Sequence, residues 1–79
     1  MTNKEAAKFI RTELAERGIK ARVKMDGQKA IYVSRPAYNV ELSDLDQLII
    51  KALIETLDYT CVRGLPVSVN SWGGVFYRP

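Results

Sequence analysis

The chain of 79 residues contains no histidine and only one cysteine, Cys61. Histidine is the commonest general base and the commonest zinc ligand, and it activates serine and cysteine nucleophiles. A single cysteine cannot form an internal disulfide, and the apolar context of Cys61 favours a buried small side chain. These shortages indicate a protein that is not an enzyme and that uses neither a metal nor another cofactor.

Long hydrophobic runs are lacking as well. The run Leu48-Ile49-Ile50 ends at Lys51, and no stretch approaches the ~18 residues that a membrane-spanning helix needs. The N-terminal residues do not have the apolar segment and small-residue cleavage site of a signal peptide. Hydrophobic residues make up 47% and charged residues 27% of the chain, proportions typical of a globular protein. We therefore expect one domain over residues 1–79, located in the cytoplasm.

Residues 3–17 have the pattern of an amphipathic helix. Thr2 and Glu5 stand at the spacing of a capping box, in which each side chain bonds to the backbone of the other residue. Apolar side chains then recur every three or four positions, and Gly18 supplies the left-handed residue that commonly follows a helix. The apolar positions are Ala6, Phe9, Ile10 and Leu14.

A β-hairpin is predicted after this helix. Residues 19–25 alternate between apolar and cationic side chains, and residues 29–34 form a second apolar run. Asp26 and Gly27 between them are a common turn pair. We expect the apolar side chains of both strands to face the core, and the cations and Tyr32 to face solvent. The residues expected in the core are Ile19, Ala21, Val23, Ile31 and Val33.

The register of the hairpin follows from the same alternation. A two-residue loop would set Ile31 on the face of the cations, whereas a three-residue loop at residues 25–27 pairs Ala21 with Ile31. The longer loop keeps the apolar residues on one face and places Lys20 across from Tyr32. We therefore expect the three-residue loop.

A second helix is predicted after Ser43, which has the side chain of an N-cap. At ~100° per residue its apolar side chains cover roughly two thirds of the circumference, more than a one-sided surface helix needs. Ile50 and Ile54 lie outside the main apolar stripe. Either the C-terminal strands cover them, or they form an association surface for a second copy of the chain or another partner. The main stripe is Leu45, Leu48, Ile49, Ala52, Leu53 and Leu57.

The C-terminal segment resembles a series of short strands. Residues 60–62, 65–69 and 75–77 have strand patterns, and Gly73-Gly74 is predicted to be a turn. Together with the earlier elements, this gives the order α-β-β-α-β(-β). The predicted fold class is α+β, with two helices packed on one face of a small antiparallel sheet.

The outward face of the hairpin is the first candidate binding surface. Several proteins that bind RNA or single strands hold phosphates with cations and stack bases on aromatic side chains of an exposed sheet. The alternative is the ordinary solvated face of an antiparallel sheet, on which lysine and arginine are common. The residues concerned are Lys20, Arg22, Lys24, Tyr32 and Arg35.

The aromatic C-terminal segment is the second candidate. Tryptophan, tyrosine and arginine are enriched among the residues that dominate binding energy, and Trp72, Tyr77 and Arg78 stand close together in the sequence. The alternative is that Trp72 and Phe76 complete the core of a small domain.

Three stretches of the chain resemble a known type of domain. They are residues 7–14 (AKFIRTEL), 18–23 (GIKARV) and 31–34 (IYVS), which form a helix, a glycine-isoleucine entry and a basic hairpin ending in Val-Ser. This pattern resembles the large polyvalent protein-associated domains of phage and plasmid proteins. In size and in its lack of catalytic residues, the chain also resembles stand-alone phage proteins that inhibit host defences, including anti-CRISPR proteins. Both resemblances imply a mobile genetic element, and neither assigns functional residues.

Two functions are compatible with these features. The first expectation is a phage or mobile-element protein that binds and blocks a host protein complex, such as a CRISPR effector, through the hairpin face and the segment around Trp72. The alternative is a small protein that binds RNA or single-stranded DNA with its basic hairpin face. A net charge of +3 permits contact with nucleic acid but does not require it.

Overall fold

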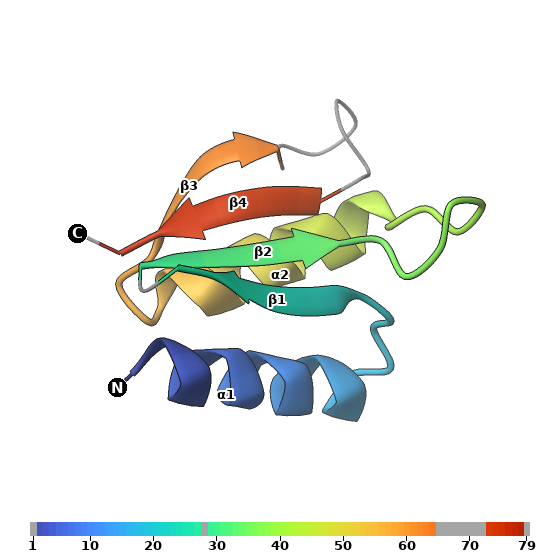
Figure 1. The fold of residues 1–79 in the computed structure, drawn as a ribbon. Helices are drawn as coiled ribbons and strands as arrows, with labels where there is room; N and C mark the ends of the chain where they lie inside the picture. Colours follow the sequence, from blue (N-terminus) through green and yellow to red (C-terminus); the bar gives the residue numbers. More distant parts are fainter. Residues whose placement is uncertain (1, 28, 65–72, 79) are drawn as a thin grey trace.

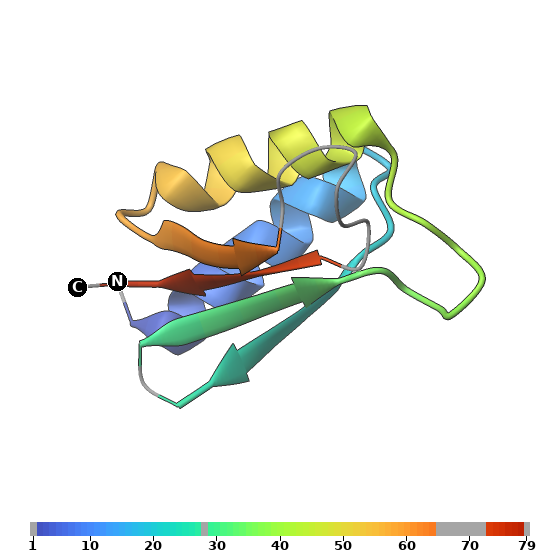
Figure 2. The same cartoon turned by 90° about the horizontal axis from the view of Figure 1, so that it is seen from above.

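The computed structural model of the chain describes residues 2–27, 29–64 and 73–78. Its elements follow the order α1 (Asn3–Glu16), β1 (Arg22–Asp26), β2 (Ala30–Ser34), α2 (Asp44–Glu55), β3 (Thr60–Gly64) and β4 (Gly73–Tyr77). All strand pairs are antiparallel, in the sheet order β1-β2-β4-β3. Both helices pack on one face of this sheet, α1 against β1 and β2 and α2 against β3 (Figures 1 and 2). The predicted α+β fold class is confirmed.

The ends of α1 are those that the sequence predicts. The Glu5 N–H donates to the Thr2 hydroxyl at 3.1 Å, and the Thr2 N–H donates to the Glu5 carboxylate at 3.0 Å, which completes the capping box. Two hydrogen bonds lower the pKa of Glu5, first the one with the Thr2 backbone and then the one with the Thr2 side chain. Both favour the charged carboxylate. After the helix, Gly18 has a φ of 70° and the Ile19 N–H donates to the Leu14 carbonyl at 2.9 Å. This pattern is a Schellman motif.

The faces of the hairpin are also confirmed. Ile19, Val23, Ile31 and Val33 are buried, and Ala21 is half-buried. The residues predicted to face solvent are exposed, namely Lys20, Arg22, Lys24 and Tyr32.

The predicted register of the hairpin is wrong. Lys24, and not Lys20, lies across from Tyr32, and the ladder runs to the Asp26–Ala30 pair, beyond the loop expected at residues 25–27. The strand also begins later than predicted, because the Ile19 N–H is already bonded to the end of α1. The chain then uses residues 19–21 to pass from helix to sheet, and β1 begins only at Arg22.

The inward face of α2 differs from the predicted stripe. Ser43 caps the helix as expected, with its hydroxyl 3.1 Å from the Asp46 N–H. Ile50 and Ile54 are completely buried within the chain, so the expectation that they form an association surface is wrong. They belong to the same core cluster as Phe76, and the third buried residue of α2 is Gln47. The outward residues are instead Leu45, 65% exposed, and Leu48, 53% exposed.

The C-terminal strands agree in part with the prediction. Phe76 is fully buried, which agrees with the interpretation that it helps to complete the core. Gly73 and Gly74 begin β4 and do not form a turn, so this prediction is wrong. At Gly73 the strand lies so close to β2 that a Cβ atom would be 1.8 Å from the Val33 carbonyl oxygen. The strand predicted at residues 65–69 and Trp72 lie outside the described residues.

Within the described ranges, no helix is long and apolar enough to span a membrane.

Candidate functional site

In the described part of the chain, no helix covers the sheet face turned away from α1 and α2 (Figure 2). Ile31, Val33 and Phe76 are buried on the helix side, so the strand residues that alternate with them project to the other side. We call this surface the open face. It comprises Arg22 and Lys24 of β1, Tyr32 and Ser34 of β2, Val62 and Arg63 of β3, and Val75 and Tyr77 of β4.

Two tyrosines lie on the open face. The register pairs Tyr32 with Val75, and Tyr77 follows two positions further along β4, so the tyrosines are diagonal neighbours at a spacing of about 7–8 Å. They line a depression of about 280 Å³ together with Val62 and Arg63. Since the tyrosines are 37% and 47% exposed, a ligand on this face can contact both rings.

Cations lie beside Tyr32 on β1. Lys24 pairs across the strands with Tyr32, and Arg22 pairs with Ser34. Both cations are exposed. Neither forms an ion pair with a carboxylate in residues 2–27, 29–64 or 73–78. Their charge is therefore available to an external anion.

Arg35 extends this cationic group beyond the end of β2. Its guanidinium lies 3.9 Å from the Glu41 carboxylate and 5.5 Å from the centre of the Tyr38 ring. Together with Arg22 and Lys24 it lines a depression of about 260 Å³. Arginine and lysine side chains that converge on one hollow offer the charged hydrogen-bond donors that phosphate groups accept.

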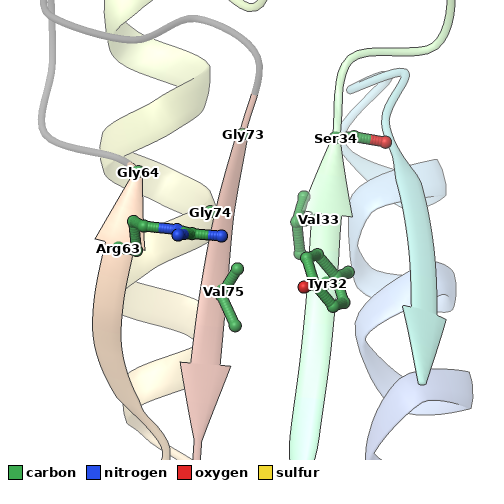
Figure 3. Close-up of a pocket in the computed structure, with 8 residues that line it drawn as sticks. All are labelled: Tyr32, Val33, Ser34, Arg63, Gly64, Gly73, Gly74 and Val75. Atoms are coloured by element: carbon green, nitrogen blue, oxygen red, sulfur yellow. The ribbon is translucent and has the colours of Figure 1, made fainter. Parts of the chain in front are cut away.

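A third depression, of about 230 Å³, lies in the middle of the open face (Figure 3). The Arg63 side chain extends from β3 over β4, and the Tyr32 ring projects from β2 on the other side, with Val75 between them. Three residues without side chains border the same hollow, beside the side chains of Tyr32, Arg63 and Val75. They are Gly64, Gly73 and Gly74.

Comparisons of the chain with protein-family models, with curated proteins and with solved structures return no match. The resemblances to mobile-element domains and to anti-CRISPR proteins therefore stay predictions.

The structure brings together only some of the residues predicted for the site. Lys20 is exposed, but it lies in the connection before β1 and outside the sheet. The Arg78 guanidinium lies 4.9 Å from the centre of the buried Tyr59 ring, and the Arg78 N–H donates to the Lys29 carbonyl at 2.9 Å. Arg78 thus packs against the core side, and we do not assign it to the open face. Trp72 is outside the described residues.

No pattern in the sequence indicates that Arg63 and Val75 belong to the site. A register shift between Cys61 and Arg63 brings Arg63 opposite Val75, and no sequence pattern reveals such an irregularity. From its place in the sequence, Tyr77 is predicted to belong to a separate C-terminal surface. The alternation of exposed Tyr77 with buried Phe76 was the only available signal that it shares a face with Tyr32.

Exposed apolar side chains also lie outside the open face, on α2 and in the segment before it. Leu45 and Leu48 on α2 are exposed, as are Tyr38 and Val40 in the segment that leads to the helix. This segment projects beyond the end of the sheet (Figure 2). In the described part of the chain, no three acidic or cysteine side chains gather in a group that could hold a metal ion.

Proposed function

We propose that this chain is a non-catalytic protein that binds single-stranded nucleic acid, RNA or DNA, on the open face of its sheet. The observation that carries the proposal is the exposed pair Tyr32 and Tyr77 on neighbouring strands, with cations on both sides. Exposed sheets that bind single strands combine aromatic side chains, on which bases stack, with cations that follow the phosphates.

The positions of the cations support the binding of a nucleic-acid strand that runs across the sheet. Arg22, Lys24 and Arg35 lie toward β1, and Arg63 lies toward the opposite edge on β3. A strand that crosses the sheet would therefore meet cations before and after the tyrosines. The chain as a whole carries a net charge of +3, which attracts a polyanion.

The test is a titration of a fluorescently labelled single strand of about 10 nucleotides, a length that single-strand binding folds cover. Fluorescence anisotropy is measured over a series of salt concentrations. We expect the affinity to fall steeply with salt, and Arg22→Ala and Lys24→Ala each to reduce the slope of log K against log salt by about 0.7. Lys4→Ala and Lys8→Ala are matched controls, because both lysines are exposed on α1. Absence of binding at low salt, or equal losses in the controls, would contradict the proposal.

A second candidate function is the blocking of a host protein complex in the cytoplasm, as an anti-CRISPR protein of a phage or mobile element does. The exposed apolar side chains of Leu45, Leu48, Tyr38 and Val40 favour it, because apolar surface in water is typical of protein contacts. The test is co-elution of the chain with a purified, nuclease-treated CRISPR effector. We expect Leu45→Asp to abolish co-elution and Arg22→Ala to preserve it if this candidate is right.

A further inference from the structure

The depression between Tyr32 and Arg63 has a shape that follows from its glycines. A Cβ atom on Gly64 would lie 2.1 Å from the Gly73 carbonyl oxygen, and a Cβ atom on Gly73 would lie 1.8 Å from that of Val33. Both positions therefore require glycine for the strands to approach each other. Both glycines border the hollow of about 230 Å³, which the side chain of Val75 also lines, and glycine in a strand commonly marks the close approach of another backbone or of a ligand.

The width of this depression suits one planar ring. Tyr32 lies on β2 and Arg63 on β3, with β4 between them, so their strands are about 9.6 Å apart at ~4.8 Å per strand spacing. A flat ring in van der Waals contact on both faces, at about 3.5–4.0 Å each, needs a gap of about 7–8 Å. Arg63 extends over β4 toward the Tyr32 side (Figure 3), which narrows the gap toward that value. A ring in the gap would rest on the Val75 side chain, which lies between the two residues.

The two side chains that flank the gap have the chemistry that recognises a nucleobase. An aromatic ring stacks on a base through its face, and the planar guanidinium of arginine stacks in the same way while it adds a positive charge. The Arg63 guanidinium forms no ion pair with the carboxylates of the described ranges. It is therefore free to lie against a bound ring.

The depression continues into the cationic hollow beside it. Ser34 lines both hollows, and its hydroxyl points from β2 toward β1, where Arg22 and Lys24 lie (Figure 3). A phosphate in the cationic hollow would thus stand next to a ring in the gap. A phosphate beside a planar ring is the arrangement of a nucleotide within a strand.

We propose that the gap between Tyr32 and Arg63 is a site for one unpaired base of a nucleic-acid strand, whose adjoining phosphate lies at Ser34, Arg22 and Lys24. This inference rests on the nucleic-acid binding proposed above. It adds that affinity depends on a base as well as on charge, and that one position on the molecule carries this dependence.

The test compares two strands of equal length and charge. One is a DNA strand made only of abasic sugar-phosphate units, and the other carries a single thymine at its centre. We expect the thymine to raise the affinity of the unaltered protein about tenfold or more. Tyr32→Ala should remove this gain and Tyr32→Phe should keep it. Arg63→Lys should remove the gain and leave the affinity for the abasic strand unchanged, because the charge remains and the stacking plane is lost.

Phe9→Ala is the matched control, since Phe9 is as exposed as Tyr32, at 37%, but lies on α1. It should keep the gain from the single thymine. Circular dichroism of each variant establishes that the fold is retained, and the exposed Arg63 gives a second variant with little risk to folding. The same strand pair in RNA form measures what a 2′-hydroxyl adds.

The outcomes separate the two proposals. Salt-dependent binding of both strands with no gain from the thymine, or a gain that survives both Tyr32→Ala and Arg63→Lys, would overturn the base site and leave nucleic-acid binding in place. If neither strand binds at low salt, both proposals are overturned.

Discussion

Gly64 and Gly73 lie where neighbouring strands leave no room for a side chain. Their φ angles are 100° and 137°, which side chains other than hydrogen rarely allow, and the atoms that a Cβ would meet belong to the backbone. Because backbone atoms cannot rotate away as a side chain can, the approach of β4 to β2 and β3 depends on these residues. The composition alone gives no sign of this, since a Gly-Gly pair is commoner in turns.

We expect Gly73→Ala to lower the free energy of unfolding by on the order of 3–5 kcal/mol, the range of backbone strain combined with a steric clash. Gly27→Ala is the matched control. Gly27 also has a positive φ, of 69°, but no atom lies within 4 Å of its Cβ position, so only the left-handed strain of about 1–2 kcal/mol applies. Urea denaturation measures both values. Equal losses in the two variants would show that the contact with β2 is unimportant.

Asn3 connects three parts of the chain through one buried amide. Its Nδ2 donates to the Ala30 carbonyl at 2.9 Å, and its Oδ1 accepts a hydrogen bond from the Tyr59 hydroxyl. Asn3 is 8% exposed, although it stands in the first turn of α1. A polar residue at a helix start is usually solvated, so the sequence predicts its place in the helix but not its partners.

We expect Asn3→Ala to destabilise the protein more than Tyr59→Phe. The first change removes the hydrogen bonds that Asn3 makes to the Ala30 carbonyl and with the Tyr59 hydroxyl in the core, at about 2–4 kcal/mol together. The second leaves only the Asn3 carbonyl oxygen unpaired, at about 1–2 kcal/mol. Thermal and urea unfolding monitored by circular dichroism give the comparison. A larger loss in Tyr59→Phe would mean that packing of Tyr59, and not the amide, dominates.

At the scale of elements, the hairpin shows that the alternation of apolar and polar residues predicts the faces of the strands but not their register. The apolar residues determine which side chains share a face, and this part of the prediction is correct. The predicted pairing of Ala21 with Ile31 would place Lys29 across from Val23, whereas Val33 lies there. This difference is an even number of positions, and an even shift leaves the faces unchanged. Alternation therefore could not select between the predicted register and the observed one.

α2 shows the same limit for a helix. Its apolar residues extend around so much of the circumference that hydrophobicity does not select an inward side. The buried side is marked by Gln47, whose Nε2 donates to the Leu42 carbonyl at 3.2 Å. This hydrogen bond joins the start of α2 to the segment that precedes it. A prediction that assigns every polar residue to solvent therefore turns the wrong side of the helix inward.

We expect Ile54→Asp to unfold the monomer and Leu48→Asp to leave it folded. Ile54 is fully buried, so an aspartate there is a buried charge without a partner and costs several kcal/mol, comparable to the whole stability of a small domain. Leu48 is 53% exposed, so its replacement should change the free energy of unfolding by about 0.5 kcal/mol or less. Circular dichroism measures the folding of each variant.

Light scattering of the same Leu48→Asp variant examines association. If Leu45 and Leu48 form a contact between two copies, the unaltered chain should have a larger hydrodynamic size than the variant. Equal sizes at high concentration would restrict this surface to contacts with other proteins.

At the scale of the whole molecule, the sheet order decides which residues become neighbours. β4 is the last strand in the chain, yet it lies between β2 and β3. This insertion brings Val75 and Tyr77 beside Tyr32 and places Arg63 on the far side of β4. The sequence identified Tyr32 and Tyr77 as candidates on two separate surfaces. It could not place them together, because local patterns carry no information on the order of strands.

The resulting molecule has two unlike faces. Helices cover one side of the sheet and bury its apolar residues, and the opposite side presents cations and tyrosines. A chain of 79 residues builds one core only. The second face of the sheet is therefore left for solvent or for a ligand, and the proposed binding of nucleic acid uses it.

Because these faces are separate, the amide spectrum of the protein can show which one a partner contacts. On addition of a single strand to isotopically labelled protein, we expect shifts of the amide signals of β1, β2, β3 and β4 near Lys24, Tyr32, Arg63 and Val75. The signals of the outward side of α1, near Lys8, should stay unchanged, because the sheet and the core lie between them and the open face. At high salt all of these shifts should become smaller, because the release of counterions then contributes less to the binding of phosphates.

A protein partner bound through α2 should instead shift the signals around Leu45 and Leu48 and leave Tyr32 unaffected. Shifts confined to α2 on addition of the strand would contradict the open face as the binding surface, even if the strand binds.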